Sequence, residues 1–142
     1  MATKADFSEA QWQTLVFSVQ GAMAFVAFSN GAHFWESMKE ATETAKFITQ
    51  QAKSSTSTLV RDLAMGDGLK RDKKLTADPA ALETEVVGVL AEASKIVADT
   101  APEELAAYKA FILGVADAAA EASGAVDSSE QAAIDKIKAA LV

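Results

Sequence analysis

The residues best suited to hold a ligand in this sequence are four carboxylates between positions 117 and 130. They are Asp117, Glu121, Asp127 and Glu130. Asp117 and Glu121 are four residues apart, a spacing that places them one above the other on one face of a helix. Such a pair can chelate a cation or take part in acid/base chemistry, although it is more usually a solvated helix face. It is therefore a candidate metal site that also has a simple structural explanation.

The same stretch can be compared with the calcium-binding loop of helix-loop-helix proteins. Gly124 falls at the turn position and Glu130 at the terminal ligand position of that loop. Ala119 stands where the first Asp ligand is needed, so too few hard oxygen ligands remain for a tight site. A helix that ends at Gly124, followed by one that begins at Asp127 or Ser128, explains the same residues. We favour this helix boundary.

The segment EASGAVDSSEQAAIDKI resembles the TerB-like tellurite-resistance proteins, with FSNGAHFWESMKEA as a degenerate first copy. The resemblance implies an all-helical domain with two similar halves and a role in bacterial stress response, often near the inner membrane. It also implies a divalent cation at the acidic turn. The residues that match the acidic positions of that family are Asp117, Glu121, Asp127 and Glu130.

A catalytic set cannot be assembled from this composition. The chain has no cysteine, which excludes disulfides, thiolate zinc sites and cysteine nucleophiles. The single histidine, His33, lies beside Phe34 and Trp35, where capping or packing is more usual than base catalysis. There is also no glycine-rich phosphate loop. We expect a protein that is not an enzyme and has no cofactor, apart from a possible divalent cation.

The net charge of −7 argues against a nucleic-acid partner, because binding to phosphates needs a clustered cationic surface. One basic cluster exists, formed by Lys70, Arg71, Lys73 and Lys74, but Asp72 interrupts it. No aromatic residue is interleaved with these charges. A solvated loop is the favoured interpretation.

Two segments position these residues and organise the chain. Residues 12–31 and 105–124 align at a constant offset of 93 residues, which pairs Gly21 with Gly114. Each segment is followed by a second helical pattern. The sequence therefore predicts an internal pseudo-two-fold repeat of helix pairs.

A single all-α domain is expected over residues 1–142. The chain has only two Pro and seven Gly, and no alternating β-branched stretch is typical of a strand. The chain is long enough to bury one hydrophobic core without the help of disulfides or bound metals. We predict a compact bundle of about six helices, with repeat halves at approximately 8–53 and 101–142 and a middle section at 54–100.

The first helix is expected to be central. Ser8 and Gln11 can form a reciprocal cap at its start, and apolar residues cover nearly its whole circumference. No charged residue occurs from Gln11 to Trp35, but the solidly apolar part, 15–28, is too short to cross about 30 Å of hydrocarbon. A buried core helix is therefore predicted, without a transmembrane segment.

Further helices follow from apolar spacing and capping residues. Thr100 and Glu103 suggest a capping box before the second copy, with Pro102 inside it. The second copy has an apolar side and an acidic side, so it should be half exposed. The expected helices lie at about 33–53, 59–65, 79–99, 102–123 and from 128 onward.

Together these features predict a helical binding or interaction module without catalysis. The first alternative is a TerB-like divalent-cation module at the acidic turn. The second is a carrier that holds a small apolar ligand among the aromatic residues of the first helix pair. The excess of apolar residues leaves a protein partner or self-association open, as well as peripheral contact with a membrane. Asp6 and Glu9 replace the basic start of a signal peptide, so we expect a cytoplasmic protein.

Overall fold

The chain is helical throughout the parts that the computed structural model describes, residues 3–28, 46–65, 79–121 and 128–141. No strand occurs in these residues, and the predicted all-α bundle of about six helices is confirmed. Residues 46–54 are helical. The other elements are η1 (Lys4–Asp6), α1 (Glu9–Phe28), α3 (Thr58–Met65), α4 (Pro79–Thr100), η2 (Pro102–Glu104), α5 (Leu105–Glu121) and α6 (Ser128–Ala140).

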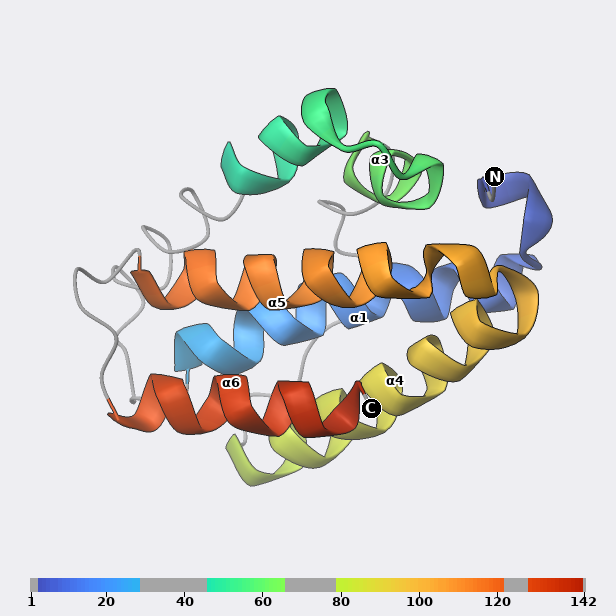
Figure 1. Ribbon diagram of the computed structural model, residues 1–142. Coiled ribbons are helices and arrows are strands. Elements are labelled where there is room, and N and C mark those ends of the chain that lie inside the picture. Colours follow the sequence, from blue (N-terminus) through green and yellow to red (C-terminus); the bar gives the residue numbers. More distant parts are fainter. Residues whose placement is uncertain (1–2, 29–45, 66–78, 122–127, 142) are drawn as a thin grey trace.

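Helix α1 is the centre of the bundle. It packs most extensively against α4, then against α5 and α6. Figure 1 shows α5 and α6 running side by side in opposite directions, with α1 behind them. The helical segment 46–54 and α3 lie on the other side of α5 from α6. Every long helix therefore has a buried side toward α1 or α5.

The start of α1 is the predicted reciprocal cap. The Ser8 amide donates to Gln11 Oε1 at 2.9 Å, and the Gln11 amide donates to Ser8 Oγ at 3.1 Å. Two amides that would lack partners at the helix end are thereby satisfied. Leu15, Val19 and Val26 have no exposed surface, so the prediction of a core helix is also confirmed.

Two glycines in the middle of helices allow close helix packing. A Cβ at Gly21 would lie 3.1 Å from Cγ2 of Val86 on α4. A Cβ at Gly114 would lie 2.5 Å from Cζ of Phe47, in the segment 46–54. The absence of a side chain at these positions is therefore what allows α4 and the 46–54 helix to come so close.

The predicted pseudo-two-fold repeat stays a prediction. Both copies supply core residues at matching positions, since Leu15 and Tyr108 are fully buried, as are Val19 and Ile112. Most of the predicted second helix of the first half, at about 33–53, lies outside the described residues.

The predicted capping box at Thr100 is wrong. Helix α4 continues through Thr100, and the chain turns at Ala101, which precedes η2 without a side-chain cap. The Ala101 amide donates to Val97 O at 2.7 Å, and its carbonyl accepts from the Glu104 amide at 2.9 Å. Backbone hydrogen bonds therefore form this turn. Ala101 is only 1% exposed and belongs to the hydrophobic core.

The described helices differ from a membrane span, which needs about 20 consecutive, mostly apolar residues. None of them is both long enough and apolar enough to cross a bilayer. This agrees with the expectation drawn from the short apolar part of α1.

Candidate functional site

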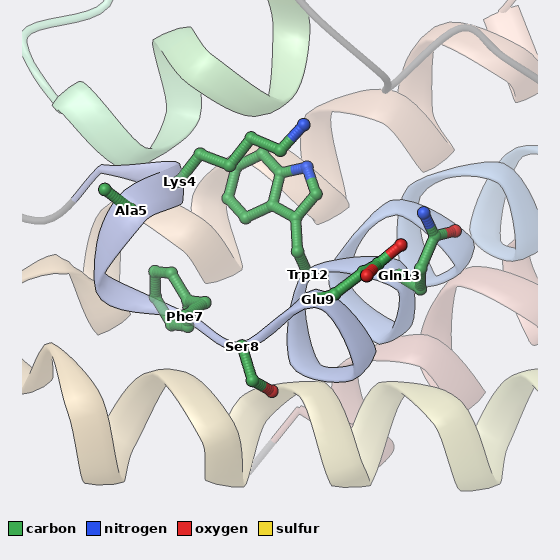
Figure 2. A pocket seen from close by; sticks show the side chains of 7 residues that line it. All are labelled: Lys4, Ala5, Phe7, Ser8, Glu9, Trp12 and Gln13. Carbon is green, nitrogen blue, oxygen red and sulfur yellow. The ribbon is translucent and has the colours of Figure 1, made fainter.

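A pocket of about 370 Å³ lies where η1 meets the start of α1 (Figure 2). Its volume is at the low end of the range for small-molecule sites, roughly 300–1,000 Å³. The residues that line it are Lys4, Ala5, Phe7, Ser8, Glu9, Trp12 and Gln13. The lining combines two aromatic rings, an ammonium group, a carboxylate and an amide.

A tight turn in front of α1 shapes this pocket. The Thr3 amide donates to Asp6 Oδ2 at 2.8 Å, and the Asp6 amide donates back to Thr3 O at 3.0 Å. The Phe7 amide donates to Lys4 O at 3.2 Å, which closes the 3-10 turn. Ser8 then caps α1, which begins at Glu9, and Figure 1 shows that the chain reverses its course between η1 and α1. This reversal brings the side chains of η1 over the first turn of α1.

Two aromatic rings form the apolar part of the pocket. The ring centroids of Phe7 and Trp12 lie 6.0 Å apart, and the rings are tilted by 44°. Figure 2 shows the Lys4 side chain extending along the Trp12 ring. Its Nζ lies 5.8 Å from the ring centroid, within the range of a cation–π contact. Both rings are largely covered, since Phe7 is 8% and Trp12 2% exposed.

The cationic side of the pocket is anchored to another helix. The Lys4 amide donates to Asp62 Oδ2 on α3 at 3.0 Å. This bond joins η1 to α3, although the two are 58 residues apart in the sequence. The backbone of Lys4 is therefore fixed against α3.

A buried carboxylate in turn fixes the start of α3. Glu104, in η2, is only 6% exposed. Its Oε2 accepts a hydrogen bond from Ser57 Oγ and another from the Leu59 amide at 3.3 Å. Ser57 Oγ also accepts from the Val60 amide at 3.2 Å. A carboxylate at the positive end of a helix is favourable, so Glu104 acts as a remote cap for α3.

A second buried polar pair connects α1 with α5. Ser18 Oγ donates to Leu15 O at 2.6 Å and lies 2.7 Å from the Tyr108 hydroxyl. Because the only hydroxyl proton of Ser18 is used by Leu15, Tyr108 is the donor in this pair. The bond satisfies a tyrosine that has no exposed surface. It is a structural contact of the core rather than part of the pocket.

The stability of the protein should fall in alkali because of Tyr108, the only tyrosine in the chain. Burial raises the pKa of its hydroxyl well above the ordinary value of 10, and the bond with Ser18 offsets this only in part. Below about pH 10 both the folded and the unfolded forms are protonated, so the full stability is present. Above it, the unfolded form ionises first, and the free energy of unfolding falls by up to about 1.4 kcal/mol per pH unit.

Urea unfolding from pH 8 to pH 11.5 measures this effect against Tyr108→Phe. At pH 8 the native chain should be more stable than the variant by about 1 kcal/mol, the value of one hydrogen bond. This advantage should disappear as the pH rises above 10, because phenylalanine does not ionise. A difference in stability between the native chain and Tyr108→Phe that stays constant with pH would contradict the raised pKa of Tyr108.

Not every buried polar group has a partner. Among the described residues, Nε2 of Gln20 on α1 is buried without a hydrogen bond. Ser94, by contrast, donates to Leu141 O at 3.1 Å and ties α4 to the chain end after α6. An unpartnered buried amide costs about 1–3 kcal/mol, so Gln20 lowers the stability of the core.

The structure describes only part of the predicted metal site. Asp117 is exposed on α5, and Glu121 is the last residue of that helix. Glu130 lies in the first turn of α6, while Asp127 falls outside the described residues. The side-chain positions of Glu121 and Glu130 also lie outside the description. Within the described residues, no three His, Cys, Asp or Glu side chains are grouped to hold a metal.

The structure describes the side chains of three aromatic residues from the predicted apolar ligand site. Trp12, Phe17 and Phe25 are all buried in α1, with exposed fractions of 2%, 6% and 8%. Phe34 and Trp35 lie outside the described residues, as do His33 and the basic cluster. Of the three, Trp12 also lines the pocket beside η1, while Phe17 and Phe25 do not.

Sequence patterns gave no signal for the pocket or for Glu104. The pocket residues span a 3-10 turn and the start of an α-helix, so they share no single period. Glu104 is buried and the preceding Glu103 is exposed, but the two residues are of the same type and nothing in the local sequence distinguishes them. No family model, curated protein or solved structure matches the chain.

Proposed function

We propose that the chain is a non-catalytic binding module whose ligand site is the pocket between η1 and α1. The observation that supports this most is the lining of the pocket, in which Phe7 and Trp12 are combined with the charged groups of Lys4 and Glu9. A few polar groups placed around an apolar surface are typical of small-molecule sites.

Most of the other buried polar groups have hydrogen-bond partners within the protein. Glu104 caps α3, and Tyr108 is bonded to Ser18. These groups stabilise the bundle and need no ligand to explain them. The pocket residues differ because Lys4 and Glu9 are exposed at its edge and reach solvent. This contrast favours the pocket as the binding site.

Tryptophan emission tests the proposal directly. The chain has two tryptophans, so Trp35→Phe leaves Trp12 as the only reporter. A library of small acids, amines, zwitterions and neutral aromatic compounds should contain members that shift or quench Trp12 emission in a saturable way. Trp12→Phe, which retains Trp35, is the matched control. Saturable changes confined to the control, or none in either variant, would contradict the proposal.

The TerB-like alternative places a divalent cation at the acidic turn. It is supported by the exposed position of Asp117 near the end of α5 and by the packing of α5 against α6, which the turn connects. Under this alternative, calorimetric titration with calcium, zinc or manganese gives heat that Asp117→Ala and Glu121→Ala each abolish. Glu85→Ala, at an exposed carboxylate on α4, is the matched control.

The pocket proposal predicts a different result for the same variants. Asp117→Ala should leave ligand binding at Trp12 unchanged within about twofold, because Asp117 is not among the residues that line the pocket. A loss of pocket binding in this variant, but not in Glu85→Ala, would show that the pocket is not an independent site.

A further inference from the structure

The four long helices bury a core among themselves. Helices α1, α4, α5 and α6 each pack against the other three. Each of them supplies side chains with no exposed surface to this core, for example Val19, Leu90, Ile112 and Ile137. The bundle therefore has apolar contacts that do not depend on the rest of the chain.

Residues 46–65 form an outer layer on one side of this bundle. The layer consists of the helical segment 46–54, a short turn and α3. Figure 1 shows it beside α5, on the side away from α6. Helix α3 packs chiefly against α5 and η1. It has only eight residues, which is too short for a helix to be stable in water without tertiary contacts.

Two hydrogen-bonded ties hold the outer layer in place. Glu104 Oε2 accepts from Ser57 Oγ and, at 3.3 Å, from the Leu59 amide. Asp62 Oδ2 accepts from the Lys4 amide at 3.0 Å. Glu104 lies in η2 and Lys4 in η1, so both ties end in the 3-10 turns that precede α5 and α1. Neither tie includes a residue of the four long helices.

The apolar contact of the outer layer is made on α5. Phe47 stacks on Phe111, with ring centroids 6.4 Å apart, and lies over Gly114, where a Cβ would be only 2.5 Å away. Ile48 and Leu63 have no exposed surface. Separation of the layer from α5 would therefore expose apolar surface on both, while the contacts among the four long helices remain.

From these features we propose that the outer layer is a lid, which opens as one unit while the four-helix bundle stays folded. Glu104 and Asp62 hold it closed. Proteins open locally in such cooperative units, and the units with few contacts to the rest open most easily. Opening uncovers the apolar face of α5 around Phe111 and Gly114. This inference does not depend on a ligand in the pocket beside η1.

Thiol labelling measures the opening, because the native chain has no cysteine. Leu63→Cys places one thiol in the lid and Leu90→Cys places one in the bundle, and neither leucine has exposed surface. The labelling rate with Ellman's reagent, divided by the rate in the unfolded chain, gives the open fraction. For Leu90→Cys this fraction should equal the unfolded fraction obtained from urea unfolding. For Leu63→Cys it should exceed the unfolded fraction of the same variant by about tenfold or more.

A second change separates opening of the lid from global unfolding. Ile137→Val weakens the core at α6, which packs against α1, α4 and α5. It should raise the labelling rate of Leu90→Cys about fivefold, since that thiol reacts only after the bundle unfolds. The rate of Leu63→Cys should stay within about twofold, because Ile137 remains packed when the lid opens. An equal rise at both thiols would overturn the inference, as would an open fraction of Leu63→Cys equal to its unfolded fraction.

A third change tests the tie at Glu104. Glu104→Gln keeps the size of the side chain but removes its charge, which weakens the bonds to Ser57 and Leu59. The labelling rate of Leu63→Cys should rise about fivefold. Glu103→Gln, at the exposed neighbouring position, is the matched control and should leave the rate unchanged. A rate that does not change in Glu104→Gln would overturn the role of Glu104 in holding the lid closed. Circular dichroism melting shows whether each variant is folded.

Discussion

Replacing Glu104 with leucine is expected to lower the free energy of unfolding by about 3 kcal/mol, the upper range for hydrogen bonds to a charged group. Leucine fills much of the same space but accepts no hydrogen bond. The Leu59 amide at the start of α3 would then be buried without its partner, and Ser57 would lose its acceptor. Urea unfolding measures the change, with Glu103→Leu at the exposed neighbouring carboxylate as the control.

The effect of Glu104→Leu should be local as well as global. Amide hydrogen exchange in α3 should accelerate more than in α4, because Glu104 accepts the hydrogen bond of the Leu59 amide at the start of α3. Replacing a buried carboxylate with an apolar residue can also be neutral or stabilising when the cost of desolvating it dominates. A Glu104→Leu variant as stable as the native chain would therefore contradict the role of Glu104 as the anchor of α3.

Adding one methyl group at Gly114 should destabilise the bundle by about 2 kcal/mol, while the same change at Gly88 should stabilise it by about 1 kcal/mol. A Cβ at Gly114 would lie 2.5 Å from Phe47, whose ring stacks on Phe111 with centroids 6.4 Å apart. Phe47 would have to move away. Gly88 is exposed on α4 and a Cβ there meets nothing within 4 Å, so only the gain in helix propensity remains.

Thermal and urea unfolding of Gly114→Ala and Gly88→Ala test this pair together. The two changes are chemically identical and both lie inside helices, so the opposite signs isolate the contact with Phe47. Phe47→Ala in the Gly114→Ala background should remove the clash, and the further loss should then be smaller than in the native background. Stabilisation by Gly114→Ala would contradict the close packing of the 46–54 segment on α5.

Much of the fold follows from local patterns in the sequence. The reciprocal cap of Ser8 and Gln11 was predicted from residue types and spacing, because both partners lie within one helical turn. The buried face of α1 was predicted from its apolar circumference, since only a central helix can cover such a surface. The start of α4 at Pro79 was predicted from its position behind Asp78.

The errors occurred where distant residues decide the local structure. The capping box at Thr100 was predicted from a motif that fits, but α4 continues through Thr100 and the backbone around Ala101 makes the turn. Glu104 was missed for a related reason, because its partners at the start of α3 are about 45 residues away in the sequence. A local pattern does not distinguish a solvated carboxylate from one that caps a remote helix.

The candidate site illustrates the same limit. Asp117 and Glu121 are candidate metal ligands in the sequence because they are four residues apart, which places them on one face of a helix. The pocket residues, by contrast, come together only because the η1 turn reverses the chain in front of α1 and Asp62 holds it there. Trp12 was predicted as a core residue, and its second role in the pocket depends on where Lys4 and Phe7 lie.

The most direct test of the binding site is a titration followed in the nitrogen-15 amide spectrum of the native chain, with the library compounds that shift or quench Trp12 emission as the probes. The pocket account predicts saturable shifts that are largest for amides of residues 4–13, with smaller shifts near Asp62 on α3. Saturable shifts that instead centre on residues 117–130, or that leave residues 4–13 unchanged, would contradict it.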